Sequence, residues 1–236
     1  VNIGEAFSWA ISVLQKNLGV LVGLAALVLL ADCGGSRTSV GTPVVTSFYP
    51  LRFVAEQVVG QVSGPAVSVR DLTPAGAEPH DLELSARDLV RLRRAAIVVY
   101  LRGFSPAVDH AVDVAAADHA VDVGVAAHLL TAGSGKDPHF WLDPLRLADV
   151  ADAVASQFSA IRPTDAATFH AGAARLRDRL VALDAEFTEG LRDCASRELV
   201  TSHEAFGYFA SRYGLRQTGV TGLVPDREPT PAELAD

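Results

Sequence analysis

The 236-residue sequence contains no methionine, only two cysteines and no run of basic residues. Cys33 and Cys194 are too few for a disulfide scaffold and do not have the spacing of a cysteine metal site. The formal net charge of −8 and the lack of a basic patch argue against a nucleic-acid partner. Hydrophobic residues make up 49% of the chain, which is enough for one large domain or two small lobes.

The sequence also lacks an uncharged apolar run of the about 20 residues that a bilayer span needs. Residues 18–31 form a shorter apolar stretch, as in the hydrophobic region of a signal peptide. The segment Ala-Asp-Cys-Gly around Cys33 follows, and it resembles a bacterial lipobox except at Asp32, where a small neutral residue is usual. We therefore expect residues 1–33 to be a signal peptide with Cys33 as the lipidation site, and an uncleaved membrane anchor is the alternative. Either way the remainder is exported, to the outer face of the cytoplasmic membrane or the periplasm.

Strand and helix patterns alternate after a polar linker at residues 34–43. Ser85 with Asp88 three residues later is a capping-box pattern that begins a helix. Residues 96–101 are continuously apolar, which is typical of a buried parallel strand. The alternation predicts an α/β lobe with a mostly parallel sheet over residues 44–162. Its other expected elements are strands at 44–48 and 66–72 and a helix at 51–59.

The clearest helix signal lies in residues 163–193. Apolar side chains recur there at alternating spacings of four and three residues, from Phe169 to Leu191. The pattern predicts a helix of roughly 28 residues, about 40 Å long at 1.5 Å per residue. Such a helix is long enough to connect two lobes rigidly.

Residues 194–236 predict the start of a second α/β lobe. The patterns indicate a strand at 198–202, a helix at 204–213 and a second strand at 216–221, and the last residues resemble another helix start. Two strands and a helix cannot enclose a core of their own. We therefore expect this lobe to be incomplete and the sequence to be truncated.

The sequence contains a short duplication near its middle. The hexapeptide Asp-His-Ala-Val-Asp-Val occurs at residues 109–114 and again at 118–123. It is far too short for the unit of a repeat protein, so we interpret it as a local duplication. Its histidines, His110 and His119, and the nearby His128 are interpreted as surface residues that form no defined site.

Three other histidines lie in loops of distinctive sequence. His80 follows a predicted strand in Thr-Pro-Ala-Gly-Ala-Glu-Pro-His-Asp, His139 lies in Asp-Pro-His-Phe-Trp-Leu-Asp-Pro, and His203 ends a predicted strand in Ser-His-Glu-Ala-Phe-Gly-Tyr. Ligands of open α/β sheets bind outside the carboxyl ends of the strands, where His80 and His203 are expected. Neutral imidazole suits zinc better than magnesium or calcium, and three nitrogens with one oxygen complete a tetrahedron. The alternative for each histidine alone is an ordinary loop or core residue.

These three segments, in this order, resemble those of the metal-binding proteins of zinc and manganese ABC uptake systems, which include zinc-uptake periplasmic proteins and manganese-binding lipoprotein adhesins. The resemblance extends from about residue 43 onward. It implies two Rossmann-like α/β lobes joined by one long rigid helix, with the metal between them. His80 and His139 are the implied ligands from the first lobe and His203 from the second, where histidine favours zinc over manganese. The resemblance further implies that Zn²⁺ is the transported ligand, that an ABC permease is the partner, and that the protein is a monomer.

Two features depart from this family. Its fourth ligand is usually an aspartate near the C-terminus, and this sequence ends before that position. Glu78, two residues before His80, is a candidate substitute, and water is another. Zinc-uptake members also often carry a long loop rich in His and Asp before the second ligand, which is absent here.

Two other functions compete with zinc uptake. A zinc-dependent hydrolase would use an open coordination position to activate water. His203 and Glu204 do not belong to a His-Glu-x-x-His segment, so no zincin helix is present, and we expect no enzyme activity. The second alternative, a manganese-binding or adhesive surface lipoprotein of the same family, has no sequence signature of its own.

Overall fold

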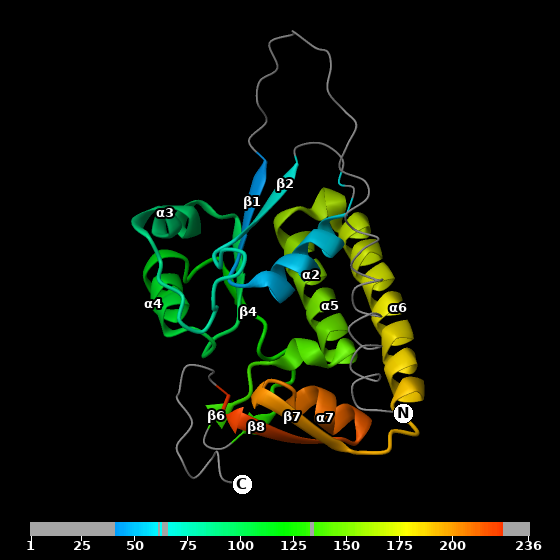
Figure 1. Cartoon of the computed structure of the whole chain (residues 1–236). Helices are drawn as coiled ribbons and strands as arrows, with labels where there is room; N and C mark the ends of the chain where they lie inside the picture. The colour runs from blue at the N-terminus through cyan, green and yellow to red at the C-terminus, as the bar shows by residue number, and fades with distance from the viewer. Residues whose placement is uncertain (1–40, 61, 63–65, 133–134, 224–236) are drawn as a thin grey trace, which may run out of the picture.

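The computed structural model of the protein describes residues 41–60, 62, 66–132 and 135–223 (Figure 1). The predicted signal peptide, the lipidation site at Cys33 and most of the linker lie outside the described residues, as do residues 224–236 of the predicted second lobe. No helix in the described ranges is both long and apolar enough to cross a membrane.

A four-stranded parallel sheet forms the centre of the first lobe. Its strands are β1 (Thr42–Thr46), β2 (Val67–Asp71), β3 (Ile97–Tyr100) and β4 (Ala120–Asp122), in the order β2-β1-β3-β4. The parallel sheet predicted from the sequence is therefore confirmed. Its strands all run in one direction, so all four carboxyl ends, and the loops that follow them, open at the same edge.

Helices cover both faces of this sheet. They are α2 (Tyr49–Val59), α3 (Ala86–Arg94), α4 (Pro106–Ala115), α5 (Pro144–Ile161) and α6 (Ala166–Gly190). Successive strand residues point to opposite faces, and the two cores follow this alternation. One core joins Val44 and Val99 to α2, α5 and α6, and the other joins Val45 and Val98 to α3 and α4. Figure 1 shows the two groups of helices on either side of β1.

The capping box at the start of α3 is present as predicted. The backbone N–H of Asp88 donates to Oγ of Ser85 at 3.4 Å, and Oδ2 of Asp88 accepts from the backbone N–H of Ser85 at 3.0 Å. This reciprocal pair satisfies two N–H groups that a helix start otherwise leaves without partners.

The α5 helix, by contrast, has no counterpart among the elements that the sequence patterns predicted.

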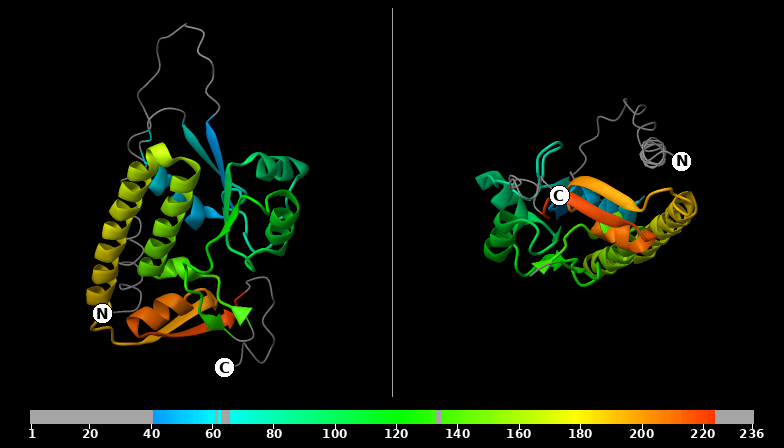
Figure 2. Two further views of the ribbon diagram at one scale, coloured as in Figure 1. Left: turned by 180° about the vertical axis from the view of Figure 1, so that it is seen from behind. Right: turned by 60° about the horizontal axis from the view of Figure 1, so that its bottom comes forward.

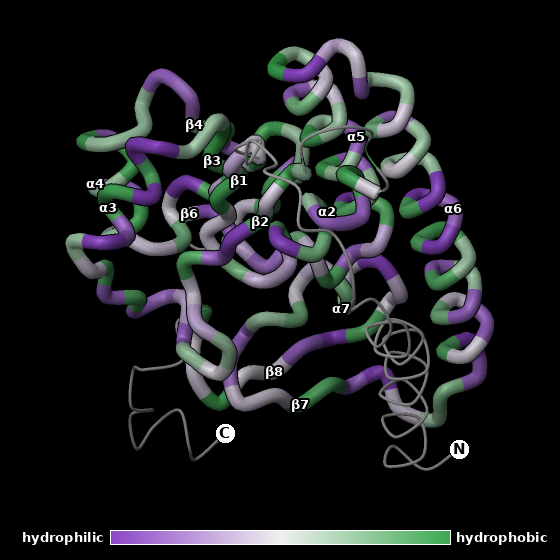
Figure 3. The backbone as a smooth tube through the Cα atoms, turned by 90° about the horizontal axis from the view of Figure 1, so that it is seen from above, coloured by the Kyte–Doolittle hydropathy of each residue, from purple (hydrophilic) through white to green (hydrophobic). Residues whose placement is uncertain are grey.

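The long helix α6 is shorter than predicted, at 25 residues. A 3₁₀ turn at Pro163–Asp165 precedes it, and Nε of Arg162 donates to Oδ2 of the buried Asp165 at 2.6 Å within that turn. Hydrophilic and hydrophobic segments alternate along α6 (Figure 3), as expected for a helix with one buried face. It packs closely on α2, because an added Cβ on Gly172 would lie 2.5 Å from the carbonyl oxygen of Val58.

A small second unit lies at the far end of α6 (Figures 1 and 2). It consists of the parallel strands β7 (Glu198–His203) and β8 (Arg216–Thr221) and the helix α7 (Gly207–Tyr213). The helix was predicted to begin at Glu204, but the backbone N–H of Glu204 donates to the carbonyl of Gly222 beyond β8. Residues 204–206 form a bend and a turn, and α7 begins three residues later than predicted. The division of the chain into lobes at the predicted boundaries stays a prediction.

The second cysteine lies in this unit. Cys194 is partly buried and packs against a small core that includes Phe187, Leu191 and Tyr213. It forms no disulfide with any described residue.

The duplicated hexapeptide adopts two different structures. Residues 109–114 lie within α4, whereas residues 118–123 form a turn followed by β4. Pro106 begins α4 at a position where its missing N–H costs nothing. The second copy instead extends along β3, with which β4 forms a parallel pair.

Candidate metal site

His80 lies in the loop between β2 and α3. Its backbone N–H donates to Oε1 of Glu78 at 3.1 Å, and the residue is 8% exposed. Its ring packs against Phe104, with 4.3 Å between the ring centres. Phe104 follows β3, so the loops after β2 and β3 together hold the ring of His80.

His139 is the most deeply buried of the three histidines, at 2% exposed. Oδ1 of Asp137 accepts from its backbone N–H at 2.9 Å and from its ring Nδ1 at 2.8 Å. An ionised carboxylate only accepts hydrogen bonds, so Nδ1 carries the hydrogen. The other ring nitrogen, Nε2, is buried and has no partner in the described part of the chain.

An unpaired buried nitrogen beside a carboxylate–histidine pair is the arrangement that proteins use at metal sites. The carboxylate fixes the tautomer and makes the free nitrogen of the ring a better ligand. In His139 that free nitrogen is Nε2. A zinc ion would supply the missing partner, so this residue fits the metal predicted from the sequence.

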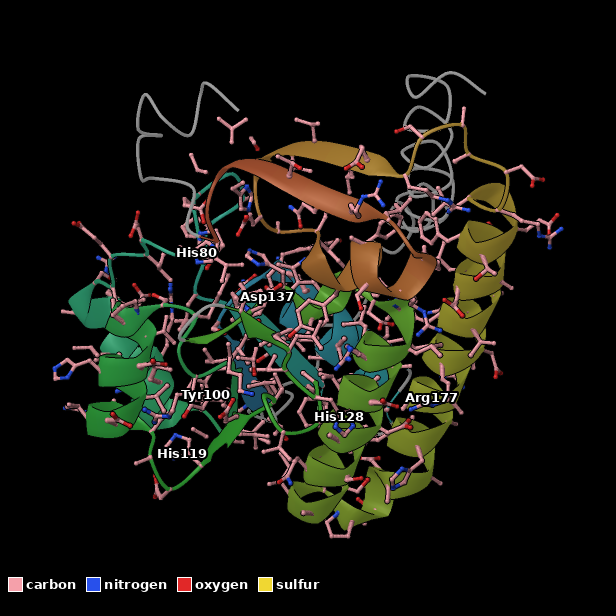
Figure 4. The ribbon with its side chains drawn as sticks, turned by 90° about the horizontal axis from the view of Figure 1, so that it is seen from below. His80, Tyr100, His119, His128, Asp137 and Arg177 are labelled. Carbon is pink, nitrogen blue, oxygen red and sulfur yellow. The ribbon has the colours of Figure 1, made fainter. Side chains whose placement is uncertain are left out.

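His203, the last residue of β7, brings the second unit to the same place. Its ring centre lies 5.5 Å from that of His139, and the ring centre of His139 lies 5.4 Å from that of His80. The three histidines that are far apart in the sequence are therefore neighbours in space, with His139 in the middle. In Figure 4, His80 and Asp137 lie on the side of the first lobe that faces β7 and β8.

The three rings do not yet converge on one point. Within the described ranges, no group of three or more His, Cys, Asp or Glu side chains is arranged to hold a metal ion without movement. His139 is the ring that neighbours both of the others, those of His80 and His203.

The protonation of the outer histidines suits a cation. Burial lowers the pKa of His80 below its usual 6.5, and the neighbouring His139 lowers it further. Burial also lowers the pKa of His203, and His139 lowers it further. The charge of Glu78 raises the pKa of both histidines and so opposes these shifts. Neutral imidazole, the form that binds metals, is therefore favoured at pH 7.

Glu78 lies close enough to influence both outer histidines. Its charge acts on the pKa of His80 and of His203, and its side chain is exposed. The carboxylate is already engaged by the backbone N–H of His80. A second oxygen remains for a metal ion, so Glu78 and water both stay candidates for the fourth ligand.

Aromatic side chains that the sequence patterns did not single out surround these rings. Trp141 lies 5.3 Å from His139 between ring centres and 5.7 Å from Phe104, and Phe48 lies 4.5 Å from Phe104. Phe104 and Trp141 each lie beside one of the histidine rings. Trp141 lies in the same distinctive segment as His139, so the sequence could have indicated it. Phe48 and Phe104 follow different strands, and no local pattern connects them.

The remaining candidate histidines lie elsewhere. His110 and His128 are exposed, as predicted. His119 is not a free surface residue, because its Nδ1 pairs with Asp118 at 2.7 Å and its Nε2 with the carbonyl of Leu92 at 2.9 Å. Figure 4 shows His119 and His128 apart from His80 and Asp137.

The sequence matches one family model and several curated relatives. The model of the family described as zinc-uptake complex component A, periplasmic (ZnuA), matches residues 44–236. The zinc-binding lipoprotein AdcA of Streptococcus pneumoniae is 31% identical over 241 residues, which cover 94% of this chain and 47% of that protein. The high-affinity zinc uptake system protein ZnuA of Bacillus subtilis is 30% identical over 246 residues, covering 94% of this chain and 76% of that protein. The chain thus spans about half the length of the AdcA relatives.

Solved structures show the same fold. The Zn(II)-bound AdcA of Streptococcus pneumoniae superposes with a TM-score of 0.71 at 33% identity, over 83% of this chain and 42% of that chain. The laminin-binding protein Lmb of Streptococcus agalactiae superposes with a TM-score of 0.72 at 28% identity, over 83% of this chain and 74% of that chain. The predicted α/β architecture with a long helix is therefore confirmed.

Proposed function

The chain belongs to the zinc-uptake complex component A family, and on that premise we propose that it captures Zn²⁺ outside the cytoplasm and delivers it to an ABC permease. The observation that carries the proposal is the buried, unpaired Nε2 of His139 beside the rings of His80 and His203. A buried polar atom without a partner costs about 1–3 kcal/mol. Binding of zinc removes that cost, so the site is poised to take up a cation.

In this proposal His80, His139 and His203 supply three nitrogens, and Glu78 or water completes the tetrahedron. Packing against Phe104 orients the ring of His80 before metal binds, and the hydrogen bond to Asp137 orients that of His139. His203 arrives on a separate unit, so closing and opening of that unit would capture and release the ion. A nitrogen-rich site favours zinc over manganese, which prefers oxygen ligands.

Export and anchoring belong to the same proposal. Relatives are named as lipoproteins or uptake-system proteins. We infer that Cys33 carries a lipid, which would hold the protein at the outer face of the cytoplasmic membrane close to its permease.

The proposal includes no catalytic step. The family is one of solute-binding transport components. Glu204, the acid next to His203, packs over β8, because its Cγ lies 2.5 Å from the position of an added Cβ on Gly219. A general base would need to reach a water bound to the metal, whereas Glu204 packs over β8. Hydrolysis of a chromogenic ester with zinc, at rates above those of free zinc, would contradict this part of the proposal.

Adhesion is a weaker candidate. The Lmb protein of Streptococcus agalactiae is described as bifunctional, with adhesin and metal transporting activity. Among the described residues, we found no surface feature that favours adhesion over transport. We therefore propose no second function.

The test is zinc titration of the wild-type chain and of His139→Ala by calorimetry, with His110→Ala as the matched control. The loss of the central nitrogen should weaken binding by at least two orders of magnitude, which is about 2.7 kcal/mol. The exposed His110 lies in α4 and should be silent. Unchanged affinity of the His139 variant would remove this residue from the site and the proposal with it.

A further inference from the structure

We infer that Gly207 and Tyr208, the first two residues of α7, are positioning residues for the zinc site: they hold Asp137 in place and, through it, the ring of His139. This inference rests on the proposed function, because it concerns the same histidine. Neither residue touches the ring of His139, and the effect of each passes through Asp137.

Gly207 acts on the side chain of Asp137. An added Cβ on Gly207 would lie 2.8 Å from Oδ2 of Asp137, closer than real Cβ contacts come. The other oxygen, Oδ1, accepts both hydrogen bonds from His139. The carboxylate is therefore enclosed between the backbone of α7 on one side and His139 on the other, and its side chain is only 5% exposed.

Tyr208 acts on the backbone of the same residue. Its hydroxyl donates to the carbonyl of Asp137 at 2.7 Å and accepts from the N–H of Leu130 at 2.8 Å, and the residue is 1% exposed. The N–H of Asp137 in turn donates to the carbonyl of Leu130 at 3.0 Å. A single hydroxyl thus bridges the N–H of Leu130 and the carbonyl of Asp137, two backbone groups that face each other.

The bridge continues a short hairpin. The strands β5 (Thr131–Ala132) and β6 (Gly135–Lys136) pair antiparallel, with Thr131 opposite Lys136, so Leu130 and Asp137 are the next pair. In an antiparallel ladder, every second pair is hydrogen-bonded and exchanges two direct N–H···O bonds. Here one bond is direct, and the Tyr208 hydroxyl replaces the other. The α7 helix is therefore joined to the hairpin that leads into Asp137 and His139.

The same segment also carries the third histidine. His203 ends β7, and Gly207 begins α7 directly after the short connection. Displacement of this segment would withdraw the ring of His203 and at the same time release Asp137. His139 would then lose the carboxylate that keeps the hydrogen on Nδ1 and leaves Nε2 free. The second and third ligands are in this way coupled through α7.

A purely structural role for the two residues makes a different prediction. Tyr208 is a core residue and Gly207 a close-packed one, so their replacement would lower stability in any case. A structural role would leave zinc affinity and the tautomer of His139 unchanged in the folded fraction. A positioning role changes both, because loss of an outer-shell partner typically weakens metal binding about 10–100-fold.

The experiment compares full-length wild type with Gly207→Ala and Tyr208→Phe, with Gly135→Ala as the control. Gly135 lies in the same hairpin, and an added Cβ there meets no atom within 4 Å. Zinc affinity is measured by competition with a chromogenic chelator, and the His139 tautomer by ¹⁵N NMR of the metal-free protein. Both variants should lose about 10–100-fold in affinity and show a mixture of tautomers. The control should match wild type.

The double variant Gly207→Ala with Asp137→Asn tests the route. If Gly207 acts through the carboxylate, this variant should bind zinc no more weakly than Asp137→Asn alone. Additive losses would overturn the inference, as would wild-type affinity with an unchanged tautomer in folded Gly207→Ala and Tyr208→Phe. If the glycine variant does not fold, Tyr208→Phe decides alone. Wild-type zinc binding by His139→Ala would instead contradict the proposed function.

Discussion

The carboxyl group of Asp71 should make the protein less stable as the pH rises from about 4 to about 6. Asp71 ends β2, and burial raises its pKa from 3.8 to about 6, although hydrogen bonds from Thr73, Thr46 and Leu72 oppose the shift. Between these two values the folded protein keeps a proton that the unfolded chain has lost. The free energy of unfolding therefore falls through this range and stays reduced above it.

The size of the effect follows from the shift. Two pKa units correspond to about 3 kcal/mol. The carboxyl is partly exposed, and solvent screening reduces this to on the order of 1–2 kcal/mol. Asp71→Asn removes the titration and keeps an oxygen that accepts from Thr46. At pH 7–8 it should raise the free energy of unfolding by that amount, and the melting temperature by about 3–6 °C.

Urea unfolding of wild type and Asp71→Asn between pH 4 and pH 8 measures this difference directly. Asp178→Asn, which changes an exposed aspartate of α6, is the control. The advantage of Asp71→Asn should be largest at pH 7–8 and should vanish near pH 4. An advantage of equal size at both ends of the range would refute the reasoning, and so would a less stable variant at pH 8.

Two further predictions concern the whole protein. Zinc at one hundred times its dissociation constant should stabilise the folded state by about 2.7 kcal/mol and raise the melting temperature by about 5–10 °C; thermal scans with and without a chelator would show this, and no shift would contradict zinc capture. Gly172→Ala should lower the free energy of unfolding by about 1–3 kcal/mol, because its Cβ would lie 2.5 Å from the carbonyl oxygen of Val58. Urea unfolding beside Gly222→Ala, where an added Cβ meets nothing within 4 Å, checks it, and equal stability of the two variants would count against the close packing of α6 on α2.

The main features of the fold were predictable because their signals are local. The apolar spacing after Phe169 indicated α6, and Ser85 with Asp88 indicated the start of α3. Such signals come from residues within one turn or one strand and do not depend on contacts with distant parts of the chain. The α5 helix carries a signal of the same kind, because its buried Leu147, Val150, Val154 and Phe158 recur at spacings of three and four residues, but the predicted elements do not include it.

The candidate site likewise contains residues that the sequence indicates and partners that it does not. Its three histidines are candidates from the sequence because each lies in a distinctive segment, and the resemblance to a family orders those segments. The partners that give the site its properties were not predictable. Phe104 reaches His80 from another strand, and Tyr208 reaches Asp137 from the second unit. These contacts join residues far apart in the chain, so no sequence period records them.

Local sequence patterns therefore predict the parts of the molecule: a parallel α/β lobe, one long helix and three histidines suited to zinc. Which of these residues lie next to one another depends on the packing of distant segments. The hexapeptide shared by residues 109–114 and 118–123 is a helix in one place and a turn and strand in the other, where it pairs with β3. In the same way, only packing placed His139 between His80 and His203 and left its Nε2 without a partner among the described residues. Local preferences are worth a fraction of about 1 kcal/mol per residue, so burial and long-range pairing override them.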